Sequence, residues 1–185
     1  MAIKITTKTG DKGTTGLANG ERLPKSDLLF EVIGTLDELN SWLGLVAVKL
    51  GTSDQPHRDW LYSIQDTLFY VGAELARSPQ AKLAEDQVEA LEIYGQELEE
   101  KMPGEWHTQF LLPGGTELGA QLDIARTVCR RCERLIVHYS QNQVVSPVIL
   151  RYVNRLSDFL YLLRCFVNQQ QQYHEKKFRV AVKPK

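Results

Sequence analysis

The chain is organised around the stretch Arg126-Thr-Val-Cys-Arg-Arg-Cys-Glu-Arg134, which lies inside a long helical pattern. Small and apolar residues recur through this pattern at alternating spacings of four and three, and they form one buried stripe: Leu118, Leu122, Ala125, Cys129, Cys132 and Ile136. A second face of the same helix carries Arg126, Arg130 and Glu133, with Arg131 and Arg134 beside them. Guanidinium groups next to an apolar seam need a partner, because an unpaired buried charge is strongly destabilising. The partner is a carboxylate of another helix or an anionic ligand, unless the face is simply a solvated basic surface.

Composition narrows the class of protein. The chain has 185 residues, a formal net charge of -1 and 43% hydrophobic residues, which fits one domain, residues 1–185, with a substantial core. The near-neutral balance argues against a nucleic-acid partner, and no apolar run is long enough to span a bilayer. The N-terminus lacks a signal-peptide core, and three cysteines, an odd number, fit a reducing compartment. We therefore expect a cytoplasmic protein without membrane contact.

Further amphipathic patterns on both sides of the central stretch predict five helices. The first begins near Ser26 or Asp27, and the second ends before Ser78. An acidic third helix over about 85–101 is expected on the outside, a fourth runs over about 116–140, and a fifth starts at Ser146-Pro147. With mostly short connections and no strand alternation, the pattern predicts an all-α fold, an up-and-down five-helix bundle. The polar residues 169–185 are expected to form a flexible tail.

The first 26 residues show no helical pattern and instead combine glycines, hydroxyls and lysines. They include the run Thr6-Thr-Lys-Thr-Gly-Asp-Lys-Gly-Thr-Thr-Gly16. Glycines allow the backbone to approach a ligand closely, and successive N–H groups can form an anion-binding nest that threonine and lysine complete. A mobile polar arm would explain the same composition.

Other residues could act together with this arm. Asp37 lies beside the apolar stripe of the first helix, either as an exposed acid or as a partner for a central arginine. Phe110 either plugs the end of the bundle or shapes a pocket for a flat apolar ligand. Asn154 and Asp158 share one side of the last helix. Together, the N-terminal arm, the arginines of the central helix and these polar groups would suit a polyphosphate ligand. The carboxylates would either orient the arginines or bind a hydrated magnesium ion.

Cys129 and Cys132 both fall on the buried stripe of the central helix. A zinc site would require four ligands, and the sequence offers no second cysteine pair and no histidine cluster, so no protein metal site is expected. A redox role is conceivable, because nearby arginines lower the pKa of a thiol. We expect instead that the two cysteines act as small hydrophobic residues of the core.

Taken in order, these blocks resemble the PduO-type ATP:cob(I)alamin adenosyltransferases over about residues 5–170. The resemblance rests on Thr7-Lys-Thr-Gly-Asp-Lys-Gly13, Glu21-Arg-Leu-Pro-Lys25, Gly34-Thr-Leu-Asp-Glu-Leu-Asn40, Phe110-Leu-Leu-Pro-Gly-Gly115, the central stretch and Tyr152-Val-Asn-Arg-Leu-Ser-Asp158. One departure is Cys132, at a position that is commonly small in the family. The resemblance implies transfer of the 5′-deoxyadenosyl group of ATP to cob(I)alamin, with magnesium present and triphosphate released. It also implies a homotrimer with a site in each cleft between subunits.

The resemblance assigns roles to particular residues. One subunit would line ATP with Thr7, Lys8, Thr9, Gly10, Thr15, Gly16 and Lys25. The neighbouring subunit would contribute Arg130, Arg131, Glu133, Arg134 and Asn154. Asp37 would pair with Arg126 across the interface, Phe110 would cap the cobalamin, and Arg130 would stabilise the leaving triphosphate. Further partners would be a flavin reductase and a cobalamin-dependent enzyme. The alternatives are a non-catalytic nucleotide-binding cobalamin sensor or delivery module, and a purely structural bundle.

Overall fold

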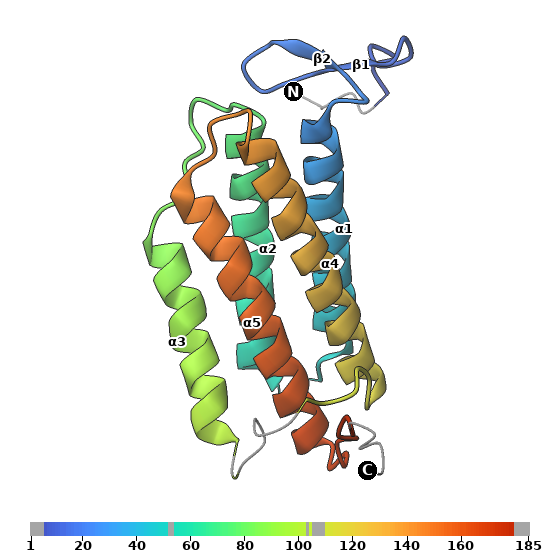
Figure 1. Cartoon of the computed structure of the whole chain (residues 1–185), viewed down its shortest axis with the longest axis vertical. Coiled ribbons are helices and arrows are strands. Elements are labelled where there is room, and N and C mark those ends of the chain that lie inside the picture. The colour runs from blue at the N-terminus through green and yellow to red at the C-terminus, as the bar shows by residue number, and fades with distance from the viewer. Residues whose placement is uncertain (1–5, 52–53, 103, 105–109, 180–185) are drawn as a thin grey trace, which may run out of the picture.

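The computed structural model describes residues 6–51, 54–102, 104 and 110–179, and these form an up-and-down bundle of α-helices (Figure 1). The helices are α1 (Leu28–Lys49), α2 (Gln55–Leu75), α3 (Asp86–Lys101), α4 (Glu117–Ser140) and α5 (Pro147–Gln170). The all-α prediction is confirmed, and so is the number of helices in the described part of the chain.

The predicted start signals act as helix caps. A side-chain oxygen of Asp27 accepts a hydrogen bond of 2.9 Å from the backbone N–H of Leu29 at the start of α1. Thr116 and Ser146 cap α4 and α5 in the same way. These bonds satisfy N–H groups that have no partner inside the helix, which is why the helices begin at these residues.

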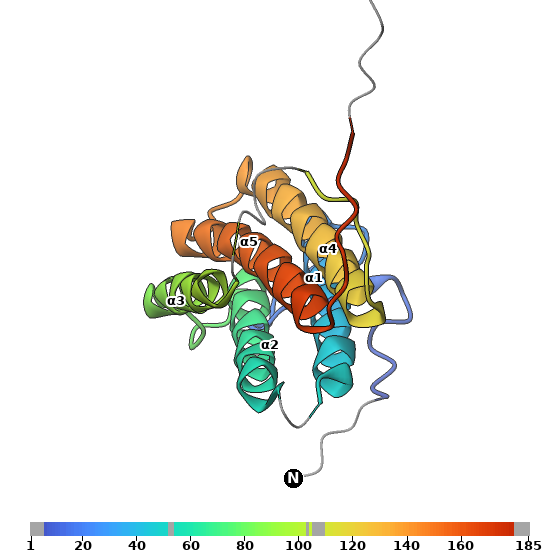
Figure 2. The ribbon, with the colours of Figure 1, turned by 90° about the horizontal axis from the view of Figure 1, so that it is seen from below.

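In the bundle, α1 packs against α2 and α4, and α5 packs against α4 and α3 (Figure 2). As expected, α3 lies at the edge, where Tyr94 stacks on Trp60 of α2 with 4.4 Å between the ring centroids. The core is drawn from all five helices, and both Cys129 and Cys132 lie in it with no exposed surface.

The N-terminal arm contains a small β-hairpin that the sequence pattern did not predict. Strand β1 (Thr14–Gly16) pairs antiparallel with β2 (Arg22–Pro24). The N–H of Ala18 donates to the carbonyl of Ala76 at 3.0 Å, and Glu21 forms an ion pair with Arg77. Strands of three residues are too short to show an alternating pattern, so only the structure reveals that this part of the arm is tied to the end of α2.

The C-terminal segment also departs from the expectation of a flexible tail from residue 169. Helix α5 continues to Gln170, and the chain then returns along the loop that follows residue 109. The N–H of Leu112 donates to the carbonyl of Lys176, and the N–H of Phe178 donates to that of Phe110, both at 2.7 Å. Up to residue 179, the segment is thus joined to the bundle by backbone pairing.

Candidate active site

The arginines of α4 form a cationic face, which we define as Arg126, Arg130, Arg131 and Arg134. Arg131 pairs with Glu38 of α1, and Arg134 donates from its guanidinium to the carbonyl of Arg130 at 3.1 Å. Arg130 is exposed and makes no ion pair with any residue that the structure describes. Its guanidinium is therefore available for an anion that comes from outside the chain.

Glu133 and Asn154 come together between α4 and α5. The side-chain amide of Asn154 donates to a carboxylate oxygen of Glu133 at 2.8 Å, and both residues are half-buried. Asp158, expected on the same side as Asn154, instead accepts from Arg155 at 2.7 Å and lines a groove between α3 and α5. The polar group beside the cationic face is thus Glu133 with Asn154, without Asp158.

Arg126 has a partner within its own helix. Its Nε atom lies 3.0 Å from Oδ1 of Asp123, a residue that is almost completely buried. Asp37 is exposed on α1, where it lines a hollow of about 400 Å³ between α1 and α2. Asp37 and Arg126 form no pair within the single chain, so the expected pairing between subunits stays a prediction.

The arm gathers several of the expected nucleotide residues at the N-terminal end of α1. Arg22 donates to the carbonyls of Thr9 and Thr14 at 2.8 and 3.1 Å, and so holds the loop before β1 against β2. Gly10 lies against Lys25, because a Cβ at Gly10 would sit 3.0 Å from the Lys25 ammonium nitrogen. The exposed members of the expected set are Thr7, Lys8, Thr9, Gly16 and Lys25, while Gly10 and Thr15 are half-buried.

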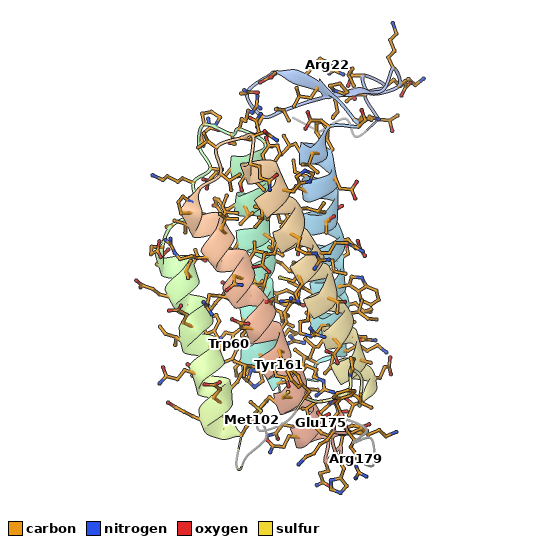
Figure 3. All side chains as sticks on the ribbon, in the orientation of Figure 1. Arg22, Trp60, Met102, Tyr161, Glu175 and Arg179 are labelled. Carbon is orange, nitrogen blue, oxygen red and sulfur yellow. The ribbon has the colours of Figure 1, made fainter. Side chains whose placement is uncertain are left out.

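Phe110 lies at the other end of the bundle. Its side chain is 84% exposed, so the alternative that it plugs the bundle end is wrong. Figure 3 shows Arg22 of the arm at one end of the bundle. Glu175 and Arg179, from the segment whose backbone pairs with residues 110–112, lie at the opposite end (Figure 3). Helix α4 has 24 residues and is therefore about 36 Å long at about 1.5 Å per residue. One chain cannot place its own arm and its own Phe110 on a single small ligand.

A buried polar network lies beneath the Phe110 loop, which we define as residues 110–115. Arg164, only 1% exposed, pairs with Oδ2 of Asp123 at 3.1 Å and with Glu175 at 2.6 Å. It also donates to the carbonyls of Leu112 and Gly114, both at 2.9 Å. The N–H of Gly114 donates to Asp123 at 2.7 Å. The carboxylate of Asp123 therefore links Arg126 of the cationic face to the Phe110 loop.

Asn168, one turn after Arg164, completes this network. It accepts from the N–H of Thr116 at 3.0 Å and donates to the carbonyl of Gly114 at 3.0 Å. A Cβ added at Gly115 or Gly119 would overlap the Asn168 side chain, which explains both glycines. The sequence reasoning missed Arg164 and Asn168. The available signal was an arginine and an amide four residues apart in an otherwise apolar helix stretch.

The described residues supply neither a thiol nucleophile nor a protein metal site. Burial raises the pKa of the Cys132 thiol from 9.0 to about 12, and burial also raises the pKa of the Cys129 thiol well above its usual value. Within the ranges that the structure covers, no group of three or more His, Cys, Asp or Glu side chains could hold a metal ion. Each helix described here is too short or too polar to cross a membrane.

The fold of this chain matches that of a known enzyme. A PduO-type ATP:corrinoid adenosyltransferase from Lactobacillus reuteri, solved as a variant complexed with cobalamin and ATP, superimposes with a TM-score of 0.88 and 32% identity over 95% of this chain and 97% of that chain. The fold and the site of this chain are therefore those of an enzyme of the corrinoid adenosyltransferase class. The sequence pattern of the family called cobalamin adenosyltransferase matches residues 5–167, and the chain belongs to that family.

Curated relatives agree with this assignment. A cobalamin adenosyltransferase of Cupriavidus metallidurans is 40% identical over 90% of this chain and 89% of the relative. A corrinoid adenosyltransferase of Bacillus subtilis is also 40% identical, over 90% of this chain and 87% of the relative. The family resemblance inferred from the sequence blocks is confirmed.

Proposed function

We propose that the chain transfers the 5′-deoxyadenosyl group of ATP to cob(I)alamin, which forms adenosylcobalamin and releases triphosphate. The observation that carries the proposal is the cationic face of α4, where the Arg130 guanidinium has no ion-pair partner among the described residues. Family membership and the relative complexed with cobalamin and ATP support the choice of substrates.

The chemistry requires no nucleophile from the protein. A cobalt(I) electron pair forms the bond to the 5′ carbon of ATP, and the bond from that carbon to the phosphate oxygen breaks. Cobalt rises formally to the +3 state, and the electron pair of the broken bond leaves with triphosphate. The two thiols of the α4 stripe are buried and protonated, which fits a reaction in which the protein aligns the substrates and stabilises the leaving group.

Arg130 is the proposed catalytic residue at the triphosphate. A guanidinium can hold two phosphate oxygens at once, and its interaction strengthens as negative charge grows on the leaving group. Arg131, Arg134 and the Glu133–Asn154 pair would line the same nucleotide, with Asn154 fixing the orientation of the carboxylate. Arg126 and Asp37 would act by holding two subunits together at this face.

The assembly that we propose is a homotrimer with sites between subunits. The arm and the Phe110 loop lie at opposite ends of one chain, so a site that uses both needs two chains (Figure 3). Arg126 contacts Asp123 through Nε, which leaves the two terminal nitrogens for Asp37 of a neighbour. The arm of one subunit would then cover ATP that the cationic face of the next subunit holds.

Phe110 is the proposed contact to the corrin. An exposed phenyl ring on a loop that is fixed from below can lie against the lower face of a corrinoid and exclude water from cobalt. A cobalt(II) that loses its lower ligand is easier to reduce to cobalt(I). This role accounts for a largely exposed aromatic side chain on an anchored loop.

Magnesium would bind with ATP. Mg²⁺ usually keeps several waters and binds through phosphates and one or two carboxylates, so it needs no cage of protein ligands. The residues present fit this mode, because Glu133 supplies one carboxylate beside the cationic face, and no larger acidic cluster is found in the described ranges. Bound magnesium would supply positive charge to the phosphates. A flavin reductase and a cobalamin-dependent enzyme as partners, and a cytoplasmic location, stay predictions.

The test is the absorbance change as cob(I)alamin becomes adenosylcobalamin, measured without oxygen and with Mg-ATP saturating. We expect a conversion that requires both the protein and ATP, and that falls sharply in Arg130→Lys. A protein that binds Mg-ATP and cobalamin without any conversion would instead be the sensor or delivery module. Absence of nucleotide binding by isothermal titration would leave only a structural bundle.

A further inference from the structure

The C-terminal segment and the Phe110 loop are held by the same side chains. We define the C-terminal latch as residues 173–178. The guanidinium of Arg164 donates to Glu175 of the latch and to two carbonyls of the loop. The amide of Asn168 likewise donates to Glu175 at 2.9 Å and to the carbonyl of Gly114 at 3.0 Å. Latch and loop are thus joined through two buried residues of α5.

Charge makes Glu175 the key member of the latch. The carboxylates of Asp123 and Glu175 balance the guanidinium groups of Arg126 and Arg164. Without Glu175, the almost fully buried Arg164 would keep only Asp123, which it shares with Arg126. A buried charge that loses a partner costs free energy, so the chain around it would rearrange.

The loop has little rigidity of its own. Gly114 and Gly115 adopt φ values of 111° and 116°, and glycine is the residue that moves most easily between such conformations. Next to them, the carbonyl of Phe110 and the N–H of Leu112 are bonded to backbone groups of the latch. The position of Phe110 therefore depends on bonds from outside the loop.

We propose that Glu175 is a positioning residue, which locks the C-terminal latch onto the Phe110 loop and thereby holds the Phe110 ring where the corrin binds. The inference rests on the proposed function, because it assigns Phe110 to the corrinoid substrate. It predicts that the latch controls the cobalamin half of the site and leaves the nucleotide half unchanged.

The first test does not use activity. Amide hydrogen exchange is measured at Leu112 and Phe178, whose N–H groups make the bonds between loop and latch. In Glu175→Ala, exchange at both amides should be faster by about tenfold, which corresponds to about 1.4 kcal/mol of lost protection. Exchange at Ala18, at the far end of the bundle, should not change, and His174→Ala, an exposed neighbour in the latch, should behave as wild type. Unaltered exchange at Leu112 in Glu175→Ala would overturn the proposal.

The second test measures turnover. With cobalt(II) and a reductant, Glu175→Ala should lose about tenfold in turnover, while turnover from preformed cob(I)alamin and the KM for ATP should stay within about twofold. If Glu175 acts through Phe110, then Glu175→Ala should cause no further loss in a Phe110→Ala background. Additive losses, or a raised KM for ATP, would contradict the proposal.

Glu175→Gln, which keeps the shape of the side chain and removes its charge, replaces the alanine variant if that variant does not fold. If the wild-type protein does not adenosylate cobalamin, the proposed function is refuted. The hydrogen-exchange measurement would still show whether Glu175 holds the latch against the Phe110 loop.

Discussion

At the scale of single residues, Arg130 and Arg126 illustrate how environment separates identical side chains on one helix face. Arg126 is held by a buried carboxylate of its own helix, whereas Arg130 has no charged partner in the described chain. A partnered arginine contributes to structure, and a free one can respond to charge that develops on a ligand. Loss of Arg130 should therefore affect the reaction more than the fold.

Arg130→Lys should lower turnover from preformed cob(I)alamin by about a hundredfold, because lysine keeps the charge but cannot hold two phosphate oxygens at once. Cobalamin affinity should change little. The measurement is the absorbance assay with Mg-ATP saturating, next to Arg151→Lys as a control, since Arg151 pairs with Glu85 on an exposed part of the surface. Wild-type turnover in Arg130→Lys would move the catalytic assignment to another residue.

Phe110→Ala should damage the reaction that starts from cobalt(II) far more than the reaction that starts from cobalt(I). The ring is proposed to exclude water and the lower ligand from cobalt, which matters for reduction and not for the transfer that follows. Turnover is measured from both starting states, with Ile93→Ala as an exposed apolar control on α3. Equal losses from both states would leave Phe110 without a role in reduction.

Cys132 gives the protein a predictable response to high pH. Burial raises the pKa of its thiol from 9.0 to about 12. The unfolded chain therefore releases this proton first, so the stability that the neutral thiol contributes is complete below pH 9 and is lost as the pH rises toward 12. Between pH 8.5 and 10, which covers the start of this window, the free energy of unfolding should fall more steeply for wild type than for Cys132→Ala. Denaturant unfolding at both pH values measures the difference, and equal slopes would mean that the thiol is not buried in solution.

At the scale of elements, start signals and apolar stripes were enough to predict the helices. Asp27, Thr116 and Ser146 act through neighbours a few residues away, so a reader of the sequence can recognise them. The network beneath the Phe110 loop was not predictable in this way. Arg164 meets Asp123 from 41 residues away and Leu112 from 52, and no local pattern encodes such contacts. The two strands of the arm could not be predicted either, because three residues are too few to show an alternating pattern.

The contact that we propose between α1 and α4 of neighbouring subunits can be tested through Asp37 and Arg126. Asp37→Ala or Arg126→Ala should sharply reduce activity. The first change leaves Arg126 with only Asp123, which it shares with Arg164, and the second leaves Asp37 without a partner in the proposed interface; a buried charge that is left fully unpaired costs about 3–5 kcal/mol. The exchange of both charges should restore little, since an aspartate at position 126 would face Asp123 one turn away. The control is Lys49→Ala, which breaks an exposed pair with Glu117 between the same two helices and should cost less than about 1 kcal/mol. Unchanged activity in both single variants would contradict the pairing.

At the scale of the whole molecule, the distance between the two ends of the bundle favours a shared site. The arm and the Phe110 loop were both recognisable in the sequence, but their separation to opposite ends of one chain was not, because it follows from the directions in which the helices run (Figure 1). Mixing two inactive variants tests this arrangement. Lys25→Ala damages the arm only, and Arg130→Lys damages the face only.

Random co-assembly of these two variants should return activity to about a quarter of the sites in a closed ring of subunits, namely those that join an intact arm to an intact face. The activity of each variant alone and of the refolded mixture is measured, and light scattering gives the size of the assembly. A mixture no more active than its components, or a monomer in solution, would mean that each chain builds its site alone.

The balanced set of Asp123, Arg126, Arg164 and Glu175 also constrains how this sequence can change over generations. Each of the four charges depends on another, so a single exchange passes through a chain with one uncompensated buried charge. A tolerated substitution at one of these positions would therefore require a second, compensating substitution at another. For Asp123 and Arg164, the two positions are more than 40 residues apart in the sequence. In a library of random single substitutions, these four positions should rank among the most depleted after selection, although only Arg126 belongs to the cationic face.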